Sequence, residues 1–151
     1  MSQEEKLAIR NQAIKYLSYR EHSCAELMNK LGSKFDEHTN IEEVVRELSE
    51  EGLQSDQRFV ELYLQGRARK GFGRRYIENA LLFKGVSKSD VASGFKACQI
   101  DWFDVLYQSW DKKFSGCVPE NLKERAKQYR FLSSRGFSNQ EIGKVYTSLL
   151  D

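Results

Sequence analysis

The sequence contains few of the residues that interrupt helices or build metal sites. Its 151 residues include one proline, Pro119, and three cysteines. The cysteines, Cys24, Cys98 and Cys117, are far apart and lack the paired spacing of a metal site, so we expect free, buried thiols. A single proline and few runs of β-branched residues argue against strands. The chain is therefore expected to be all-α and to bind no metal.

Long hydrophobic runs are also missing. No apolar run approaches the roughly 18 residues that span a membrane. Residues 1–6 are polar and acidic, whereas a signal peptide begins with a basic segment followed by an apolar one. Hydrophobic residues make up 40% of the chain and charged residues 30%, a balance typical of a folded protein. We therefore expect a folded, cytoplasmic protein that does not bind a membrane.

Catalytic motifs are missing as well. The two histidines, His22 and His38, have no nucleophile or metal ligand at a helical spacing. The segment Gly71-Phe72-Gly73 is too short for a dinucleotide-binding fingerprint, and no phosphate-binding loop with its lysine is present. We therefore predict a binding protein and not an enzyme, without catalytic residues or a cofactor.

The chain does contain a series of amphipathic helices. Apolar residues recur at helical spacing, most clearly from Ile41 to Leu48 and from Ile142 to Leu149. The pattern predicts helices near residues 5–20, 24–33, 41–51, 56–70, 74–84, 88–98, 101–115 and 121–150, the last broken at Gly136. Helix starts are predicted at Ser23, Asn40, Ser55, Ser87 and Ser138. Helix ends are predicted at Gly32, Gly52, Gly85 and Gly136.

Parts of the sequence repeat. The segment from Tyr16 to Ser23 matches the segment from Phe131 to Ser138 at a constant offset of 115 residues (131 − 16). A third copy, which includes Lys70 to Gly73, matches the first at an offset of 50 residues (70 − 20). In this alignment Leu27, Ile77 and Ile142 occupy one equivalent core position. Single repeats have too little core, so neighbours must stack. We predict three copies of one helix-turn-helix hairpin, stacked into an elongated array.

Charge is unevenly distributed along the chain. The net charge of +2 divides into −4 for residues 1–55, +4 for residues 56–85 and +2 for residues 86–151. A basic segment of this kind favours contact with DNA or with an acidic partner surface. The candidate binding residues are Arg67, Arg69, Lys70, Arg74, Arg75, Lys84 and Lys88.

The repeats help to separate structural cations from functional ones. Lys70 aligns with Arg20 and Arg135, and a cation at a helix C-terminus favours the helix dipole, so a structural role comes first there. Arg74 and Arg75 open a helix, where cations are unfavourable, and their counterparts in the other copies are uncharged. We favour anion binding at this helix start over a merely solvated surface.

Three further features of the middle and C-terminal repeats have competing interpretations. Gly73 replaces the capping serines of the other repeats, which would leave helix N–H groups open to phosphate or carboxylate. Phe72 could stack on a base, but contact with its own helix is favoured. The aromatic-rich helix from Trp102 to Phe114 is expected to pack between repeats, with an exposed partner-binding stripe as the alternative.

The middle of the chain contains a characteristic series of glycine, apolar and charged residues: Gly52, Leu53, Asp56, Arg58, Phe59, Arg67, Lys70-Gly71-Phe72-Gly73, Ile77, Leu81 and Lys84-Gly85-Val86. This series resembles the RecX family of bacterial regulatory proteins. Segments 13–31 and 130–137 resemble the same family, so the likeness spans nearly the whole chain. Gln54 and Arg74 depart from the pattern, because an apolar residue and a proline are common at these positions.

The resemblance implies an elongated tandem array of three-helix repeats, with domains at residues 1–52, 53–99 and 100–151. It also implies a non-enzymatic regulator with a defined partner. Members of such a family would bind the filament of the RecA recombinase on single-stranded DNA and restrain its ATP hydrolysis and strand exchange in recombination and the SOS response. Single-stranded DNA would then be reached through the filament and also directly, by a monomer. Two alternatives stay open, a general DNA-binding helical protein without a recombinase partner and a scaffold that only assembles proteins.

Overall fold

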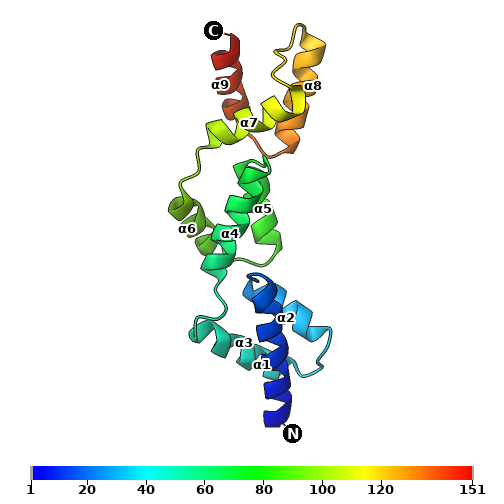
Figure 1. Ribbon diagram of the computed structural model, residues 1–151, viewed down its shortest axis with the longest axis vertical. Coiled ribbons are helices and arrows are strands. Elements are labelled where there is room, and N and C mark those ends of the chain that lie inside the picture. Colours follow the sequence, from blue (N-terminus) through cyan, green and yellow to red (C-terminus); the bar gives the residue numbers. More distant parts are fainter. Residues whose placement is uncertain (1, 151) are drawn as a thin grey trace. The chain divides into compact units, whose positions relative to one another are not determined.

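The computed structural model describes residues 2–150. These residues form helices and no strand (Figure 1), which confirms the predicted all-α class. The helices are α1 (Ser2–Tyr19), α2 (Cys24–Gly32), α3 (His38–Glu50), α4 (Asp56–Arg69), α5 (Arg74–Phe83), α6 (Lys88–Cys98), α7 (Trp102–Phe114), α8 (Leu122–Ser134) and α9 (Asn139–Leu150). None of the helices formed by the described residues is long and apolar enough to cross a membrane.

Most predicted helix starts are confirmed, because serine caps act locally. The Oγ atoms of Ser23, Ser55, Ser87 and Ser138 each accept a hydrogen bond from the backbone N–H three residues later, at 3.1–3.2 Å. Asn40 was wrong as a cap, since it lies inside α3. That helix is capped instead at Glu37, whose side chain makes no capping hydrogen bond.

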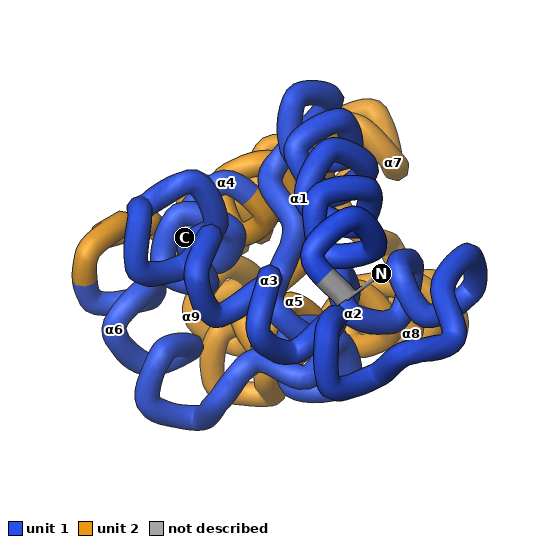
Figure 2. The backbone as a smooth tube through the Cα atoms, turned by 90° about the horizontal axis from the view of Figure 1, so that it is seen from below, with its two compact units in different colours: residues 1–62, 81–96 blue, residues 63–80, 97–151 orange. Residues whose placement is uncertain are grey.

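The chain divides into two compact units (Figure 2). Unit 1 comprises residues 1–62 and 81–96, and unit 2 comprises residues 63–80 and 97–151. Helices α4, α5 and α6 therefore contribute residues to both units.

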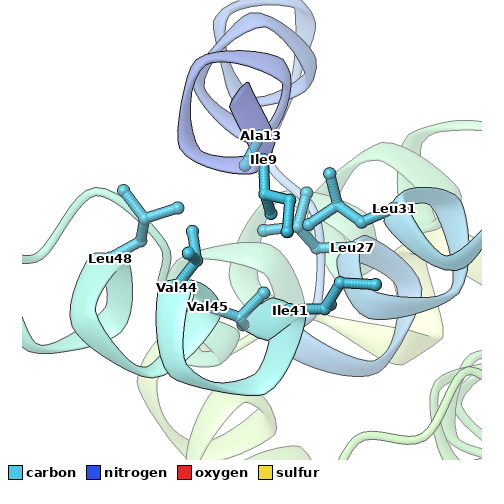
Figure 3. Packing of buried hydrophobic residues seen from close by; sticks show 8 residues of the cluster. All are labelled: Ile9, Ala13, Leu27, Leu31, Ile41, Val44, Val45 and Leu48. Carbon is cyan, nitrogen blue, oxygen red and sulfur yellow. The ribbon is translucent and has the colours of Figure 1, made fainter. Parts of the chain in front are cut away.

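Unit 1 has an aliphatic core made by its first three helices. Ile9 and Ala13 of α1 meet α2 and α3 at a cluster with at most 2% exposure (Figure 3). The remaining members of the cluster are Leu27, Leu31, Ile41, Val44, Val45 and Leu48. The stripe predicted from Ile41 to Leu48 is thus confirmed as a core face.

A buried polar cluster in unit 1 explains one departure from the family pattern. Gln54 is 2% exposed, and its side-chain amide donates to the carbonyl of His22 at 3.2 Å and to Asp56 Oδ1 at 2.9 Å. The same Asp56 oxygen accepts a hydrogen bond of 2.7 Å from the backbone N–H of Cys24. A glutamine therefore fits this buried position because both of its donors are used.

Unit 2 has a core of its own, built by α7, α8 and α9. Its buried members are Leu106, Trp110, Leu132, Phe137, Ile142, Val145 and Tyr146. One buried glutamine links all three helices and the loop before α8. Gln128 Oε1 accepts hydrogen bonds from Trp110 Nε1 at 2.8 Å and Tyr146 OH at 2.7 Å, while Nε2 donates to the carbonyl of Cys117 at 2.9 Å. Leu106 and Trp110 of the aromatic-rich helix are thus buried within the core of α7–α9 and not between repeats, whereas Phe103 is 45% exposed.

Candidate functional site

Unit 2 contains a basic depression of about 540 Å³. Five cations line it: Arg69, Lys70, Lys112, Lys113 and Arg135. Among the described residues that line the depression, none is acidic. Like charges placed together in a concave surface raise the local positive potential, so this depression attracts anions.

The ends of three helices bring these cations together. Arg69 ends α4, Lys112 and Lys113 lie in the last turn of α7, and Arg135 is the C-cap of α8. Cations at helix C-termini interact favourably with the helix dipole, which explains why each of these helices ends with a cation. The tertiary structure then brings the three helix ends, and with them the cations, together at one site.

Close packing at Gly71 allows the α4–α5 turn to approach α7. Gly71 has φ +91°, a left-handed conformation that favours glycine. A Cβ atom at this position would lie 3.1 Å from Ser109 Oγ and 3.2 Å from Ser109 Cβ. Any larger residue would therefore strain the turn and require Ser109 to shift by a few tenths of an ångström.

Aromatic rings hold several of the cations in place. The Arg135 guanidinium lies 4.5 Å from the ring centre of Phe72 and 5.0 Å from that of Phe131. Lys113 Nζ lies 5.3 Å from the Phe131 ring, and the Arg67 guanidinium lies 5.6 Å from Phe72. A ring orients a cation without neutralising its charge. These cations are thus positioned and still available to an anion.

The structure brings only part of the predicted set together. Arg69 and Lys70 line the basic depression, whereas Arg67 lies over the Phe72 ring and does not line it. Sequence reasoning missed Lys112 and Lys113 and assigned Arg135 only to the helix dipole. Adjacent lysines at a helix end were the available signal, but nothing local indicates that α7 ends near Lys70.

Arg74 and Arg75 line a separate depression of about 360 Å³. Its lining includes the carboxylates of Glu78 and Glu141, and Arg74 Nε lies 3.9 Å from Glu78. This second surface therefore has mixed charge, unlike the basic depression.

The expectation that Gly73 leaves helix N–H groups open is wrong for the groups nearest the glycine. The Gly73 N–H donates to the carbonyl of Arg135 at 2.7 Å, and the Arg75 N–H donates to that of Gly136 at 3.2 Å. A Cβ atom on Gly73 would lie 2.7 Å from the carbonyl carbon of Gly136. Glycine is thus needed there because the α8–α9 turn lies against it.

Phe72 contacts its own helix, as favoured by the sequence. Its ring stacks on Tyr76 with centres 4.3 Å apart and an interplanar angle of 23°. The partner is one residue earlier in α5 than the usual staple position.

The remaining two predicted cations belong to unit 1. Lys84 Nζ lies 3.9 Å from a carboxylate oxygen of Glu26, which also binds the Arg20 guanidinium through two hydrogen bonds of 2.9 Å. Lys88 is exposed and opens α6. Neither residue lines the basic depression.

No cluster of three or more histidine, cysteine, aspartate or glutamate residues in the described part of the chain has the arrangement of a metal site.

Comparisons with known proteins identify the family. Models of the first, second and third three-helix domains of RecX match residues 10–48, 55–93 and 99–146. Regulatory protein RecX of Pseudomonas fluorescens strain SBW25 is 40% identical over 139 residues, which cover 92% of this chain and 90% of that protein. Regulatory protein RecX of Ectopseudomonas mendocina is 37% identical, covering 92% and 93%.

Solved structures show the same fold. The crystal structure of RecX from Lactobacillus salivarius aligns with a TM-score of 0.77 and 21% identity over 97% of each chain. The nine helices of the described residues, read with the three domain matches, form three tandem three-helix domains. The chain belongs to the RecX family of regulatory proteins.

Proposed function

We propose that this protein regulates the RecA recombinase by binding the filament that the recombinase forms on single-stranded DNA. In this proposal it mainly inhibits ATP hydrolysis and strand exchange by the filament. Membership of a family of regulatory proteins supports a regulatory role. The protein acts through binding and performs no chemistry of its own.

The basic depression of unit 2 is the observation that supports this function best. Arg69, Lys70, Lys112, Lys113 and Arg135 surround it without an acidic residue among its described lining. Phosphates of single-stranded DNA are the regularly spaced anions of such a filament, and lysine and arginine supply most of the affinity for them. The depression would therefore contact the strand while other surfaces contact the recombinase.

A titration of the protein into recombinase and single-stranded DNA, followed by ATP hydrolysis, tests the proposal. The wild-type protein should slow hydrolysis in proportion to its occupancy of the filament. The double variant K112Q/K113Q should require a higher concentration for the same inhibition, because two of the five cations are lost.

The matched control is K123Q/K127Q, which removes two exposed lysines of the same unit that lie outside the depression. It should inhibit like the wild type. A wild-type protein that leaves hydrolysis unchanged, yet binds naked DNA strongly at physiological salt, would contradict the proposal and favour a general DNA-binding protein. Inhibition that does not depend on salt would instead favour a protein scaffold.

A further inference from the structure

We propose that unit 2 binds a whole nucleotide. The phosphates of the nucleotide would lie in the basic depression and the base in an adjoining depression. This inference rests on the proposed function for its biological setting, and it adds that the base is bound as well as the backbone. The ligand class is a nucleotide, whether it belongs to a DNA strand or is a free nucleoside triphosphate.

The two depressions adjoin each other, and we call them together the groove. The second has a volume of about 660 Å³ and shares Ala68, Arg69, Val105 and Gln108 with the basic depression. Both volumes are in the range of about 300–1,000 Å³ typical of small-molecule sites. We call the part lined by Lys70, Lys112, Lys113 and Arg135 the phosphate end of the groove.

The other part, which we call the base end, has the chemistry of a nucleobase site. It is lined by Gln65, Ile100, Asp101 and Asp104 in addition to the shared residues. Glutamine amides both donate and accept hydrogen bonds, which matches the edges of bases. Ala68, Val105 and Ile100 supply apolar surface for the faces of a base.

The polar groups at the base end are available to a ligand. Within residues 2–150 the side-chain amides of Gln65 and Gln108 make no hydrogen bond; the carbonyl of Gln65 accepts one of 3.3 Å from Arg69 Nε through the backbone. Asp101 is partly used, because one of its oxygens caps α7 by accepting from the Asp104 N–H at 3.1 Å. Asp104 is exposed and can accept from a ring N–H or an exocyclic amine.

The polarity of the groove distinguishes a nucleotide from a uniformly anionic ligand. Asp101 and Asp104 would repel a second phosphate or the carboxylates of an acidic peptide, whereas an uncharged base meets no such penalty. The charges therefore fix the orientation of the ligand, with phosphate toward Lys112 and Lys113 and the base toward Asp104. Arg69 lines both ends and lies at the point where a sugar would join them.

Fluorescence anisotropy with free oligonucleotides tests this inference without the recombinase. The probes are a labelled oligo-dT strand and a strand of equal length without bases, which has the same phosphates. The wild-type protein should bind oligo-dT about tenfold more tightly than the abasic strand, a difference of about 1.4 kcal/mol.

Two variants separate the ends of the groove. K112Q/K113Q should weaken binding of both probes and lower the slope of log affinity against log salt by about 1.4, since each contact contributes about 0.7. Q65A/Q108A should reduce oligo-dT binding to nearly the abasic level and leave abasic binding and the salt slope unchanged. The control K123Q/K127Q should behave like the wild type.

Competition with ATP identifies the source of the nucleotide. Displacement of oligo-dT by ATP would support the groove as a site for free nucleotide, and binding of oligo-dT without displacement would support a nucleotide within a strand. Equal affinity for oligo-dT and the abasic strand would overturn the inference. So would displacement of both probes by polyglutamate with no effect of Q65A/Q108A, or a lack of binding to either probe at low salt.

Failure of this inference can be distinguished from failure of the proposed function. A protein that inhibits the recombinase but does not distinguish the two strands would refute the nucleotide groove alone. A protein that prefers oligo-dT but leaves recombinase hydrolysis unchanged would refute the proposed function alone.

Discussion

Arg10 and Arg20 of unit 1 and Arg135 of unit 2 lie against different kinds of partner. In unit 1 the guanidinium of Arg10 lies 2.7 Å from Glu51, and that of Arg20 lies 2.9 Å from Glu26. In unit 2 the guanidinium of Arg135 instead lies over the ring of Phe72. A carboxylate cancels the charge of its arginine, whereas a ring leaves it. Arg10 and Arg20 thus serve the fold, and Arg135 can serve a ligand.

Net charge follows the same division. Unit 1 has 11 basic and 14 acidic residues, a net charge of −3, and unit 2 has 13 basic and 8 acidic residues, a net charge of +5. The described residues of unit 1 do include ring contacts of this kind, since Lys30 Nζ lies 5.1 Å and Lys34 Nζ 6.0 Å from the ring centre of Tyr16. The two units thus differ mainly in net charge, and the overall charge of +2 understates the attraction of unit 2 for anions.

The largest expected effect tests whether the two units share one repeat plan. Leu27 in unit 1 and Ile77 and Ile142 in unit 2 are each 0% exposed at equivalent positions of the repeat. Replacing any of them by alanine should lower the free energy of unfolding by about 2–5 kcal/mol, because each leaves a cavity. Thermal or urea unfolding measures the loss. Three variants with unchanged unfolding would show that the repeat alignment is wrong.

The buried glutamines should differ in importance between the units. Q128L should cost about 2–4 kcal/mol, because the buried donors of Trp110 and Tyr146 would both lose their acceptor. Q54L should cost about 1 kcal/mol, since Asp56 keeps its hydrogen bond from the Cys24 N–H. Denaturant unfolding of the two variants under one set of conditions measures both values. A larger loss for Q54L would contradict this ranking.

Local features of the fold could be predicted from the sequence, and features made by distant residues could not. Serine caps such as Ser138 and helical periodicity depend on neighbours within about one turn, so their patterns are visible in the sequence. The family resemblance also gave the three-helix organisation. The role predicted for Gly73 was wrong, because glycine is required there by the close approach of the Gly136 backbone, which is distant in the sequence.

The candidate site shows the same limit. The cluster from Arg67 to Arg75 is dense in the sequence and drew attention to the middle hairpin. Lys113 and Arg135 join it only because three helix ends converge, and an isolated helix end gives no sign of its neighbours. The sequence therefore predicted one side of the depression and missed the other.

A pH change should affect unit 1 more than unit 2. Both histidines lie in unit 1. Burial lowers the pKa of His22 below its ordinary value of 6.5, and the nearby charges of Arg20 and Lys30 lower the pKa further. Its Nε2 lies 3.0 Å from Lys30 Nζ, so the neutral ring accepts that hydrogen bond.

The lowered pKa of His22 determines the direction in which stability changes with pH. Above pH 6.5 the ring is neutral in both the folded and the unfolded state, so stability is complete. As the pH falls below that value, the unfolded state binds the proton first and stability is lost until the folded pKa is passed. Amide hydrogen exchange between pH 7.5 and pH 5.5, corrected for intrinsic rates, should show less protection in α1–α3 and little change in α7–α9. Equal loss in both units would contradict the prediction.

The smallest effect on stability is expected for Arg69, Arg74 and Arg75, whose counterparts in the other repeats are uncharged. In R69Q/R74Q/R75Q the free energy of unfolding should change by only a few tenths of a kcal/mol. The exposed i,i+4 pair of Arg74 with Glu78 stabilises by about 0.3–0.5 kcal/mol, and the removal of two cations from a helix start offsets this.

Binding should change more than folding in the same variant. If all three arginines contact phosphates, the slope of log affinity for single-stranded DNA against log salt should fall by about 2, and R69Q alone should account for about 0.7 of it. Inhibition of the recombinase should weaken in parallel. Anisotropy titrations at several salt concentrations separate the contributions. If R69Q alone produces the whole change, the mixed-charge surface at Arg74 and Arg75 is solvated, and DNA contact is confined to the groove that Arg69 lines.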